Sequence, residues 1–324
     1  MRRFLRACLF ILTLAMAVAT ANALQSPEPE FSKPLPDKPS NVPTVRVQTN
    51  LVLIPVSVRD ASEQPVTNLR MQDFAVREND AAVKLEHFGR PELSRLDLVL
   101  VFDLTSSLWY YFDLIKEAAS QFIKTLYRDG DVVSIIGISS EPKVLLQRTE
   151  SLPAILKGLN ELPRFGAATA FFDAVIQATG QFPRNSDPET RRVLVVLSDG
   201  EDNLSRSALE DALEHLQKTD TLFYSINPGA TVNHLNRVSE RGQKFMEKLA
   251  DQTGGSAFLA DNLKNLSDIY NRIAEELQVQ YLIGYNAPES SDEESFRGIT
   301  VCIPDRPDLH VRARKGYYSD RAGR

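Results

Sequence analysis

A carboxylate and two hydroxyls alternate in the run from Asp103 to Ser107, which reads Asp-Leu-Thr-Ser-Ser. Carboxylate and hydroxyl oxygens are hard ligands, which suit Mg²⁺ and do not suit soft metals. The run follows residues 96–102, which are apolar except for Asp97, a pattern typical of a strand buried on both faces. Because open α/β sheets bind ligands at the carboxyl ends of such strands, we expect this run to be functional.

Two later segments have the same character. Thr169 follows a Gly-Ala-Ala stretch just before a predicted helix. Asp199 lies in a Ser-Asp-Gly sequence directly after the apolar strand of residues 193–197. These residues are far from Asp103 in the chain, so only the fold can bring them together. We expect all three segments to meet at the carboxyl edge of one sheet.

The elements between these segments alternate between apolar strands and amphipathic helices. This rhythm implies βαβ units, and predicts an α/β fold with a doubly wound, mostly parallel sheet covered by helices on both faces. The predicted strands are 96–103, 131–139, 143–146, 192–198, 221–226 and 256–260, and the predicted helices are 109–127, 151–160, 170–182, 207–217, 236–252 and 263–279.

Both flanks of this region alternate with the period of β-strands. Residues 44–92 form the first flank, in which Asn79-Asp80 marks a turn before a return strand over residues 82–88. In the second flank, residues 279–285 and 297–303 are predicted to form a hairpin, and residues 310–314 a further strand.

A three-stranded tail on its own would expose its edges, so we expect it to pair with the first flank. The result is a small antiparallel β domain built from both chain ends, with residues 44–92 as its first part and 280–320 as its second. The α/β domain, residues 95–279, is inserted between them.

The chain has 324 residues and a formal net charge of −6. Residues 1–23 combine early arginines, an apolar stretch and an Ala-x-Ala end, as in a secretory signal peptide. Residues 24–43 are rich in proline and predict an extended linker. We therefore expect a secreted, periplasmic or cell-envelope protein with no membrane span in its mature chain.

Loss of that signal would remove three arginines and no acid, which takes the formal charge from −6 to −9. Such an acidic chain is a poor candidate for nucleic-acid binding. Cys302 would then be the sole cysteine, which excludes a disulfide within the mature chain. We expect its thiol to be buried and inert.

The three segments together resemble the von Willebrand factor type A (VWA) domain and its metal-ion-dependent adhesion site. That site has the pattern Asp-x-Ser-x-Ser, then a distant Thr, then a distant Asp. The resemblance covers residues 95–279 and assigns the metal-site roles to five residues, which are Asp103, Thr105, Ser107, Thr169 and Asp199. It implies that hydroxyls bind Mg²⁺ directly, while the acids act largely through bound waters.

This chain departs from the family pattern in two ways. Thr105 stands where serine is usual, which keeps the hydroxyl but adds a methyl group, and Ala167 and Ala168 stand where glycine is common. The flanks resemble a secreted bacterial group, the VWA-related domain of Acidobacteria. That likeness rests on residues 65–69, 73–76 and 314–318.

Three neutral hydroxyls and at most two carboxylates would leave a bound Mg²⁺ electrophilic, with a coordination position open to another acid. The sequence therefore predicts a protein-binding or adhesion module whose partner is a protein or peptide that presents an acidic residue. Mn²⁺ and Ca²⁺ are alternatives to Mg²⁺. We expect no enzymatic activity, because the common catalytic motifs are missing from the sequence.

Two other functions stay open. A Mg²⁺-dependent phosphatase-like enzyme can also begin from an aspartate at a strand end, but it needs a second aspartate two positions later, where this chain has Thr105. The other is a metal-free structural protein of the cell envelope.

For three side chains near the site, the sequence is compatible with two roles each. Trp109 could contact a partner or pack on its own helix. Glu201 and Asp202 could join the metal, but we favour a solvated position or the N-terminus of the next helix.

Overall fold

The computed structural model describes residues 51–89, 94–105, 109, 111–164, 168–184, 187–228, 237–262, 265–288 and 295–319. The predicted signal peptide and linker, and Ser107, lie outside these ranges. All elements below belong to Thr49–Arg324, which forms one unit. In this part of the chain, no helix combines the length and apolar character needed to cross a membrane.

A six-stranded sheet occupies the middle of the chain, in the order β10-β9-β8-β5-β6-β7. All neighbours are parallel except β6 and β7, which are antiparallel. All eight residues of the central strand β5 are buried, as its apolar run predicts. The strands are β5 (Leu96–Asp103), β6 (Val132–Ile138), β7 (Lys143–Thr149), β8 (Arg191–Leu197), β9 (Thr221–Asn227) and β10 (Ala257–Leu259).

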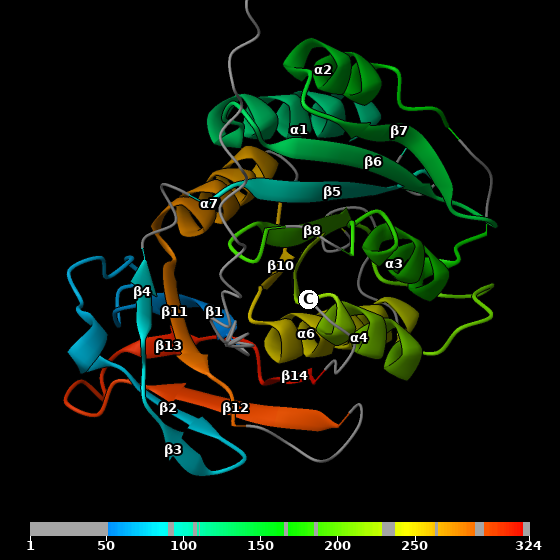
Figure 1. The fold of residues 1–324 in the computed structure, drawn as a ribbon. Helices are drawn as coiled ribbons and strands as arrows, with labels where there is room; N and C mark the ends of the chain where they lie inside the picture. Colours follow the sequence, from blue (N-terminus) through cyan, green and yellow to red (C-terminus); the bar gives the residue numbers. More distant parts are fainter. Residues whose placement is uncertain are drawn as a thin grey trace, which may run out of the picture. The chain divides into compact units, whose positions relative to one another are not determined.

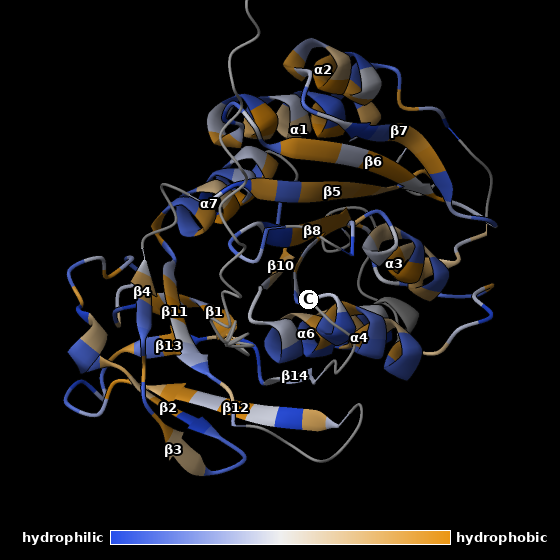
Figure 2. Cartoon of the chain, viewed as in Figure 1, coloured by the Kyte–Doolittle hydropathy of each residue, from blue (hydrophilic) through white to orange (hydrophobic). Residues whose placement is uncertain are grey.

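Helices cover both faces of this sheet (Figure 1). One hydrophobic cluster joins the sheet to α1 (Phe112–Leu126), α2 (Leu152–Asn160) and α7 (Leu266–Val279). A second joins its other face to α3 (Phe171–Thr179), α4 (Leu209–Lys218) and α6 (Arg237–Thr253). Figure 2 shows β5, β6 and β8 largely in orange, which marks the apolar layer between the helices. The predicted doubly wound α/β fold is confirmed.

Two four-stranded antiparallel sheets hold both flanks of the chain, in the orders β13-β1-β11-β4 and β14-β12-β2-β3. Their buried side chains form a third hydrophobic cluster. The predicted β layer built from both chain ends is therefore present. Its strands are β1 (Leu51–Arg59), β2 (Ala75–Glu78), β3 (Ala81–Val83), β4 (His87–Gly89), β11 (Tyr281–Asn286), β12 (Phe296–Cys302), β13 (His310–Arg312) and β14 (Gly316–Tyr318), with a 3-10 turn at Met71–Asp73.

The predicted hairpin over residues 279–303 is wrong. β11 pairs with β1 and β4, whereas β12 pairs with β2 and β14 in the other sheet. β1 offers six consecutive residues in register with β11, from Leu51 opposite Asn286 to Val56 opposite Tyr281. This long pairing takes the place of a local hairpin, because no short turn sequence links β11 to β12.

The turn at Asn79 and Asp80 is confirmed. Both residues have positive φ, 45° and 65°, and the turn joins the antiparallel pair β2 and β3. The predicted return strand is interrupted, however, because β3 and β4 belong to different sheets.

The expected burial of Cys302 is also wrong, because this residue is exposed at the end of β12. The inward-facing positions of that strand are Arg297, Ile299 and Val301, so strand alternation turns the next side chain outward.

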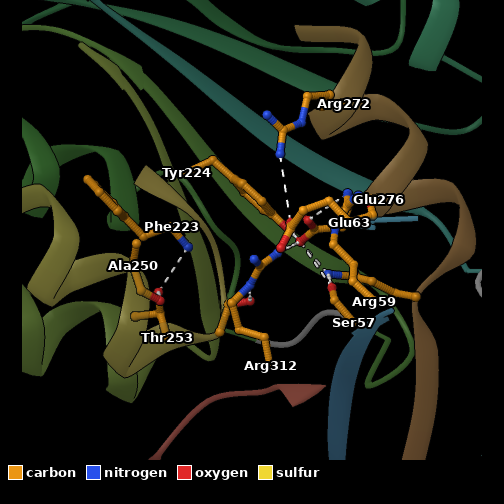
Figure 3. A network of polar contacts seen from close by, with 12 residues as sticks. Ser57, Arg59, Glu63, Phe223, Tyr224, Ala250, Thr253, Arg272, Glu276 and Arg312 are labelled. Atoms are coloured by element: carbon orange, nitrogen blue, oxygen red, sulfur yellow. Dashed lines mark hydrogen bonds and ion pairs between the residues drawn. The ribbon is translucent and has the colours of Figure 1, made fainter. Parts of the chain in front are cut away.

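A buried carboxylate, Glu276 of α7, links the two parts of the fold (Figure 3). Its Oε1 accepts hydrogen bonds from the hydroxyls of Ser57 at 3.0 Å and Tyr224 at 2.6 Å, and it pairs with Arg312. Its Oε2 accepts from Arg59 at 3.4 Å. Burial opposes ionisation, but the arginine charges and the hydrogen bonds outweigh it, so the pKa of Glu276 lies below its usual range. The carboxylate thus joins α7 to β1, β9 and β13.

Replacing this carboxylate should destabilise the whole fold. Glu276→Ala leaves Arg59 and Arg312 without their buried partner, so we expect a loss of about 3 kcal/mol in the free energy of unfolding. The neighbouring Glu275 is exposed on the same helix, and Glu275→Ala should change stability by less than about 0.5 kcal/mol. Urea unfolding of both variants measures this difference, and equal midpoints would contradict it.

The stabilisation by Glu276 should also depend on pH. Its native pKa lies below the ordinary value of 4.5, so the native state binds fewer protons than the unfolded state as the pH falls through this range. The contribution is complete above pH 4.5 and is lost at lower pH. The stability difference between the wild type and Glu276→Gln should therefore shrink below that pH, as followed by urea unfolding at a series of pH values. A difference that grows towards low pH would show that the sign is wrong.

Candidate metal centre

Asp103 is the last residue of β5, and only 2% of it is exposed. Its Oδ1 accepts a hydrogen bond from the backbone N–H of Thr105 at 3.0 Å. Its Oδ2 accepts one from the hydroxyl of Ser198 at 2.9 Å. Ser198 directly follows β8, the parallel neighbour of β5. The carboxylate is therefore held between the ends of two adjacent strands.

Asp199 places a second carboxylate next to the first. Burial raises the pKa of Asp103 to about 6, and the negative charge of Asp199 adds to the effect. Burial likewise raises the pKa of Asp199. The pKa of Glu201 is also raised, mainly by burial and to a smaller extent by the negative charge of Asp199. Within the described ranges, neither Asp103 nor Asp199 forms an ion pair with a basic side chain. These acidic groups lack a compensating cation in the described part of the chain, as expected of residues that hold a metal ion.

The Thr169 loop is fastened to the segment that follows Asp199. The backbone N–H of Thr169 donates to Oδ1 of Asn203 at 3.0 Å, and its carbonyl accepts from the backbone N–H groups of Asn203 at 3.0 Å and Leu204 at 3.2 Å. The next residue, Ala170, donates its N–H to the carbonyl of Ser139, which follows β6. Thr169 itself is buried. These bonds place its loop at the same edge of the sheet as the two carboxylates.

Asp202 makes a contact that the sequence did not predict. Its Oδ1 accepts the backbone N–H of Phe171 at 2.8 Å, at the start of α3, and also the hydroxyl of Ser205. We expected it to be solvated or at the N-terminus of the next helix, α4. Instead it satisfies a free N–H of the helix that precedes it in the chain.

A close backbone approach supports the Asp199 turn. Gly200 has a φ of +74°, and a Cβ atom there would lie 2.6 Å from the carbonyl oxygen of Gly242 in α6. A Cβ atom on Gly242 would lie 2.4 Å from the carbonyl oxygen of Asp199. Glycine is therefore required on both sides of this contact. The turn that carries Asp199 rests directly on the backbone of α6.

The structure brings four of the five predicted residues to one edge of the sheet: Asp103, Thr105, Thr169 and Asp199. Ser107 lies outside the described residues, and the metal-binding role of all five stays a prediction. The sequence had singled out Ser198 only as part of a Ser-Asp-Gly strand end. It gave no signal for Asn203, because an amide that fixes a loop from 34 residues away leaves no local pattern.

The donor set at this edge is rich in hydroxyls. In the described ranges, no group of three or more His, Cys, Asp or Glu side chains is placed to hold a metal ion. A cation here would therefore need the hydroxyls of Thr105 and Thr169 in addition to the two carboxylates. Such hard oxygen donors fit Mg²⁺ and related ions better than soft metals.

The family comparison agrees with this geometry. The model of the von Willebrand factor type A domain matches residues 97–272, more than half of the chain. The chain therefore belongs to the von Willebrand factor type A domain family. No curated protein matches its sequence. The narrower resemblance to the Acidobacteria group stays a prediction.

Solved structures show the same fold at low sequence identity. Proximal thread matrix protein 1 from the mussel byssus is 17% identical, with 63% of this chain and 51% of that chain covered and a TM-score of 0.50. A structure of the same mussel protein with a zinc-occupied MIDAS motif is 18% identical, with 63% and 50% covered and a TM-score of 0.50. A von Willebrand factor type A protein from Catenulispora acidiphila is 13% identical, with 85% and 75% covered and a TM-score of 0.49. The chain thus spans about half the length of the mussel protein.

Removing the charge of Asp103 should stabilise the metal-free protein. Burial and Asp199 both disfavour this carboxylate, whereas an asparagine can still accept one of its hydrogen bonds. In EDTA near neutral pH, we expect Asp103→Asn to raise the free energy of unfolding by about 1 kcal/mol. Excess Mg²⁺ should stabilise the wild type and leave the variant unchanged. Urea unfolding with and without Mg²⁺ measures both effects.

Asp173 supplies the matched control. Burial opposes its ionisation, but hydrogen bonds from the backbone N–H groups of Arg206 and Ser207 prevail, so its pKa is lowered. Asp173→Asn should therefore destabilise the protein in EDTA. If Asp103→Asn destabilises the metal-free protein in the same way, Asp103 is a structural carboxylate, and no cation is needed to offset its charge.

Proposed function

We propose that this chain is a secreted or periplasmic protein-binding module that holds a divalent cation, Mg²⁺ in the first place, and receives an acidic residue of a protein partner. One observation carries the proposal. Two carboxylates, Asp103 and Asp199, lie together at the strand ends without a cationic partner in the described part of the chain, with the side chain of Thr105 against Asp103 and the Thr169 loop at the same edge of the sheet. VWA domains are commonly adhesive or protein-binding, which supports the same function.

In this proposal the hydroxyls of Thr105, Ser107 and Thr169 hold the cation, with Asp103 and Asp199 close to it. When bound, the cation supplies an electrophilic position for a carboxylate from outside. The remaining contacts serve to orient these groups. Ser198 fixes the direction of the Asp103 carboxylate, and Asn203 fixes the Thr169 loop. The site is thus prepared for its ligand by hydrogen bonds within the chain.

We propose that the module binds and does not catalyse. A phosphatase of the kind considered above needs a carboxylate two residues after its nucleophile. Here that residue is Thr105, whose backbone N–H is already used to hold Asp103. Turnover of a chromogenic phosphate ester that disappears in Asp103→Asn would show that this part of the proposal is wrong.

The direct test is metal binding in the hydroxyl variants. Thr169→Val keeps the shape of the side chain and removes its hydroxyl, so we expect Mg²⁺ affinity to fall by at least about tenfold. Thr125→Val removes a hydroxyl that is exposed on α1 and should have no effect. Isothermal titration of the mature chain with Mg²⁺, Mn²⁺, Ca²⁺ and Zn²⁺ measures this. Zinc is included because the mussel byssus protein has a zinc-occupied site.

The outcomes separate the proposed function from its alternatives. Equal Mg²⁺ affinity in the wild type, Thr169→Val and Asp103→Ala would contradict the metal site and favour a metal-free structural protein. Binding of a partner that is lost in EDTA and in Thr169→Val, but kept in Thr125→Val, would support metal-dependent recognition.

A further inference from the structure

Among the described residues, five large hydrophobic side chains are exposed. Leu51, Met71 and Phe296 belong to the antiparallel β layer. The other two, Trp109 and Leu204, are 39% and 49% exposed and lie on segments that build the candidate metal centre. Neither belongs to any of the three hydrophobic clusters of described residues. Packing in the core therefore does not explain their positions.

Trp109 is anchored to the first segment of the site. Its indole Nε1–H donates to the backbone carbonyl of Leu104 at 3.2 Å. Leu104 lies between Asp103 and Thr105, and its side chain is fully buried. The bond therefore fixes the exposed indole against the strand end that carries the predicted metal ligands. The ring is therefore partly held and partly exposed, and its contact with a partner stays a prediction.

Leu204 is anchored to the second segment in a similar way. Its backbone N–H donates to the carbonyl of Thr169 at 3.2 Å, and that carbonyl also accepts the N–H of Asn203. Leu204 is thus held next to a predicted ligand, but its side chain faces solvent. Trp109 and Leu204 come from distant parts of the chain. Each donates a hydrogen bond to a backbone carbonyl in a different segment of the site, Trp109 to Leu104 and Leu204 to Thr169.

We propose that Trp109 and Leu204 form an apolar rim around the site, and that the partner presents an acidic residue with a bulky apolar neighbour. This inference rests on the proposed function and adds the apolar half of the partner's motif. A single carboxylate in contact with a hydrated ion competes with water. Apolar side chains beside such a contact exclude water and supply the additional affinity that specific recognition needs. The occupant is therefore a peptide segment of a partner protein that is both acidic and apolar.

The test is a selection of random peptides displayed on phage, with the mature chain as bait in Mg²⁺ and elution by EDTA. With the wild type, we expect the eluted peptides to be enriched in an Asp or Glu next to Leu, Phe or Trp. With Trp109→Ala or Leu204→Gln, the acid should remain enriched and the apolar neighbour should not. Met71→Ala, which alters a side chain that is 40% exposed outside the site, should behave as the wild type.

Binding of a synthetic copy of the most enriched peptide then measures how much the apolar residue contributes to affinity. Replacing its apolar residue by serine should weaken binding to the wild type by about tenfold, and should have a much smaller effect on binding to Leu204→Gln. Mg²⁺ affinity and melting temperature, measured for every variant, show whether the site is intact. If Trp109→Ala loses Mg²⁺ affinity because its bond to Leu104 is gone, Leu204→Gln decides the question.

Different outcomes would overturn the apolar rim and the proposed function. Acid enrichment without apolar neighbours, or apolar enrichment that persists with Leu204→Gln, would overturn the rim and leave the proposed function standing. No EDTA-sensitive enrichment of acidic peptides with the wild type would overturn both.

Discussion

The burial of the Asp103 carboxylate beside Asp199 is the constraint on which the candidate site depends. Asp103 ends β5, and Asp199 lies two residues after β8. The parallel register that sets Phe102 opposite Leu197 brings these two strand ends together. A buried carboxylate with a like charge nearby costs free energy, which its hydrogen bonds from Thr105 and Ser198 offset only in part, since its pKa remains raised. A cation at this edge would remove that cost. The sheet thus concentrates negative charge at the edge where such folds bind their ligands.

The loops around this edge hold one another in place. The segment after Asp199 supplies Asp202 and Asn203, which fix the start of α3 and the Thr169 loop. The turn at Asp199 is in turn set by the contact of Gly200 with α6. Because these segments are fixed by one another and by α6, their arrangement rests on contacts within the chain. Trp109 and Leu204 are each attached to this framework by one hydrogen bond, to the carbonyls of Leu104 and Thr169.

Much of this architecture could be predicted, and the failures share one physical cause. Strands from Leu96 onward were evident because continuous apolar runs and helix periods are local patterns, and the convergence of Asp103, Thr169 and Asp199 followed from the topology of parallel sheets. The partners of β11 and β12 were not evident, because either strand could pair with several others of the same alternation. Asp202 was likewise assigned to the wrong helix. Its bond to Phe171 spans 31 residues, and nothing in the local sequence favours the earlier helix over the later one.

Two buried carboxylates in this chain show how function can be separated from stability. Glu276 has Arg59 and Arg312 beside it, and its pKa is lowered despite burial. Asp103 has a like charge beside it, and its pKa is raised. The chain therefore neutralises the first carboxylate with its own arginines, in the interior where α7 meets the β layer. The second, at the edge of the sheet, has no arginine beside it in the described part of the chain, and we propose that a cation from outside balances its charge. A raised pKa alone does not mark a binding residue, because burial also raises the pKa of Asp131, which holds the backbone N–H groups of Leu96 and Arg128. What sets Asp103 apart is the second carboxylate, Asp199, at the same edge of the sheet, and this pairing is the feature that a bound cation would explain.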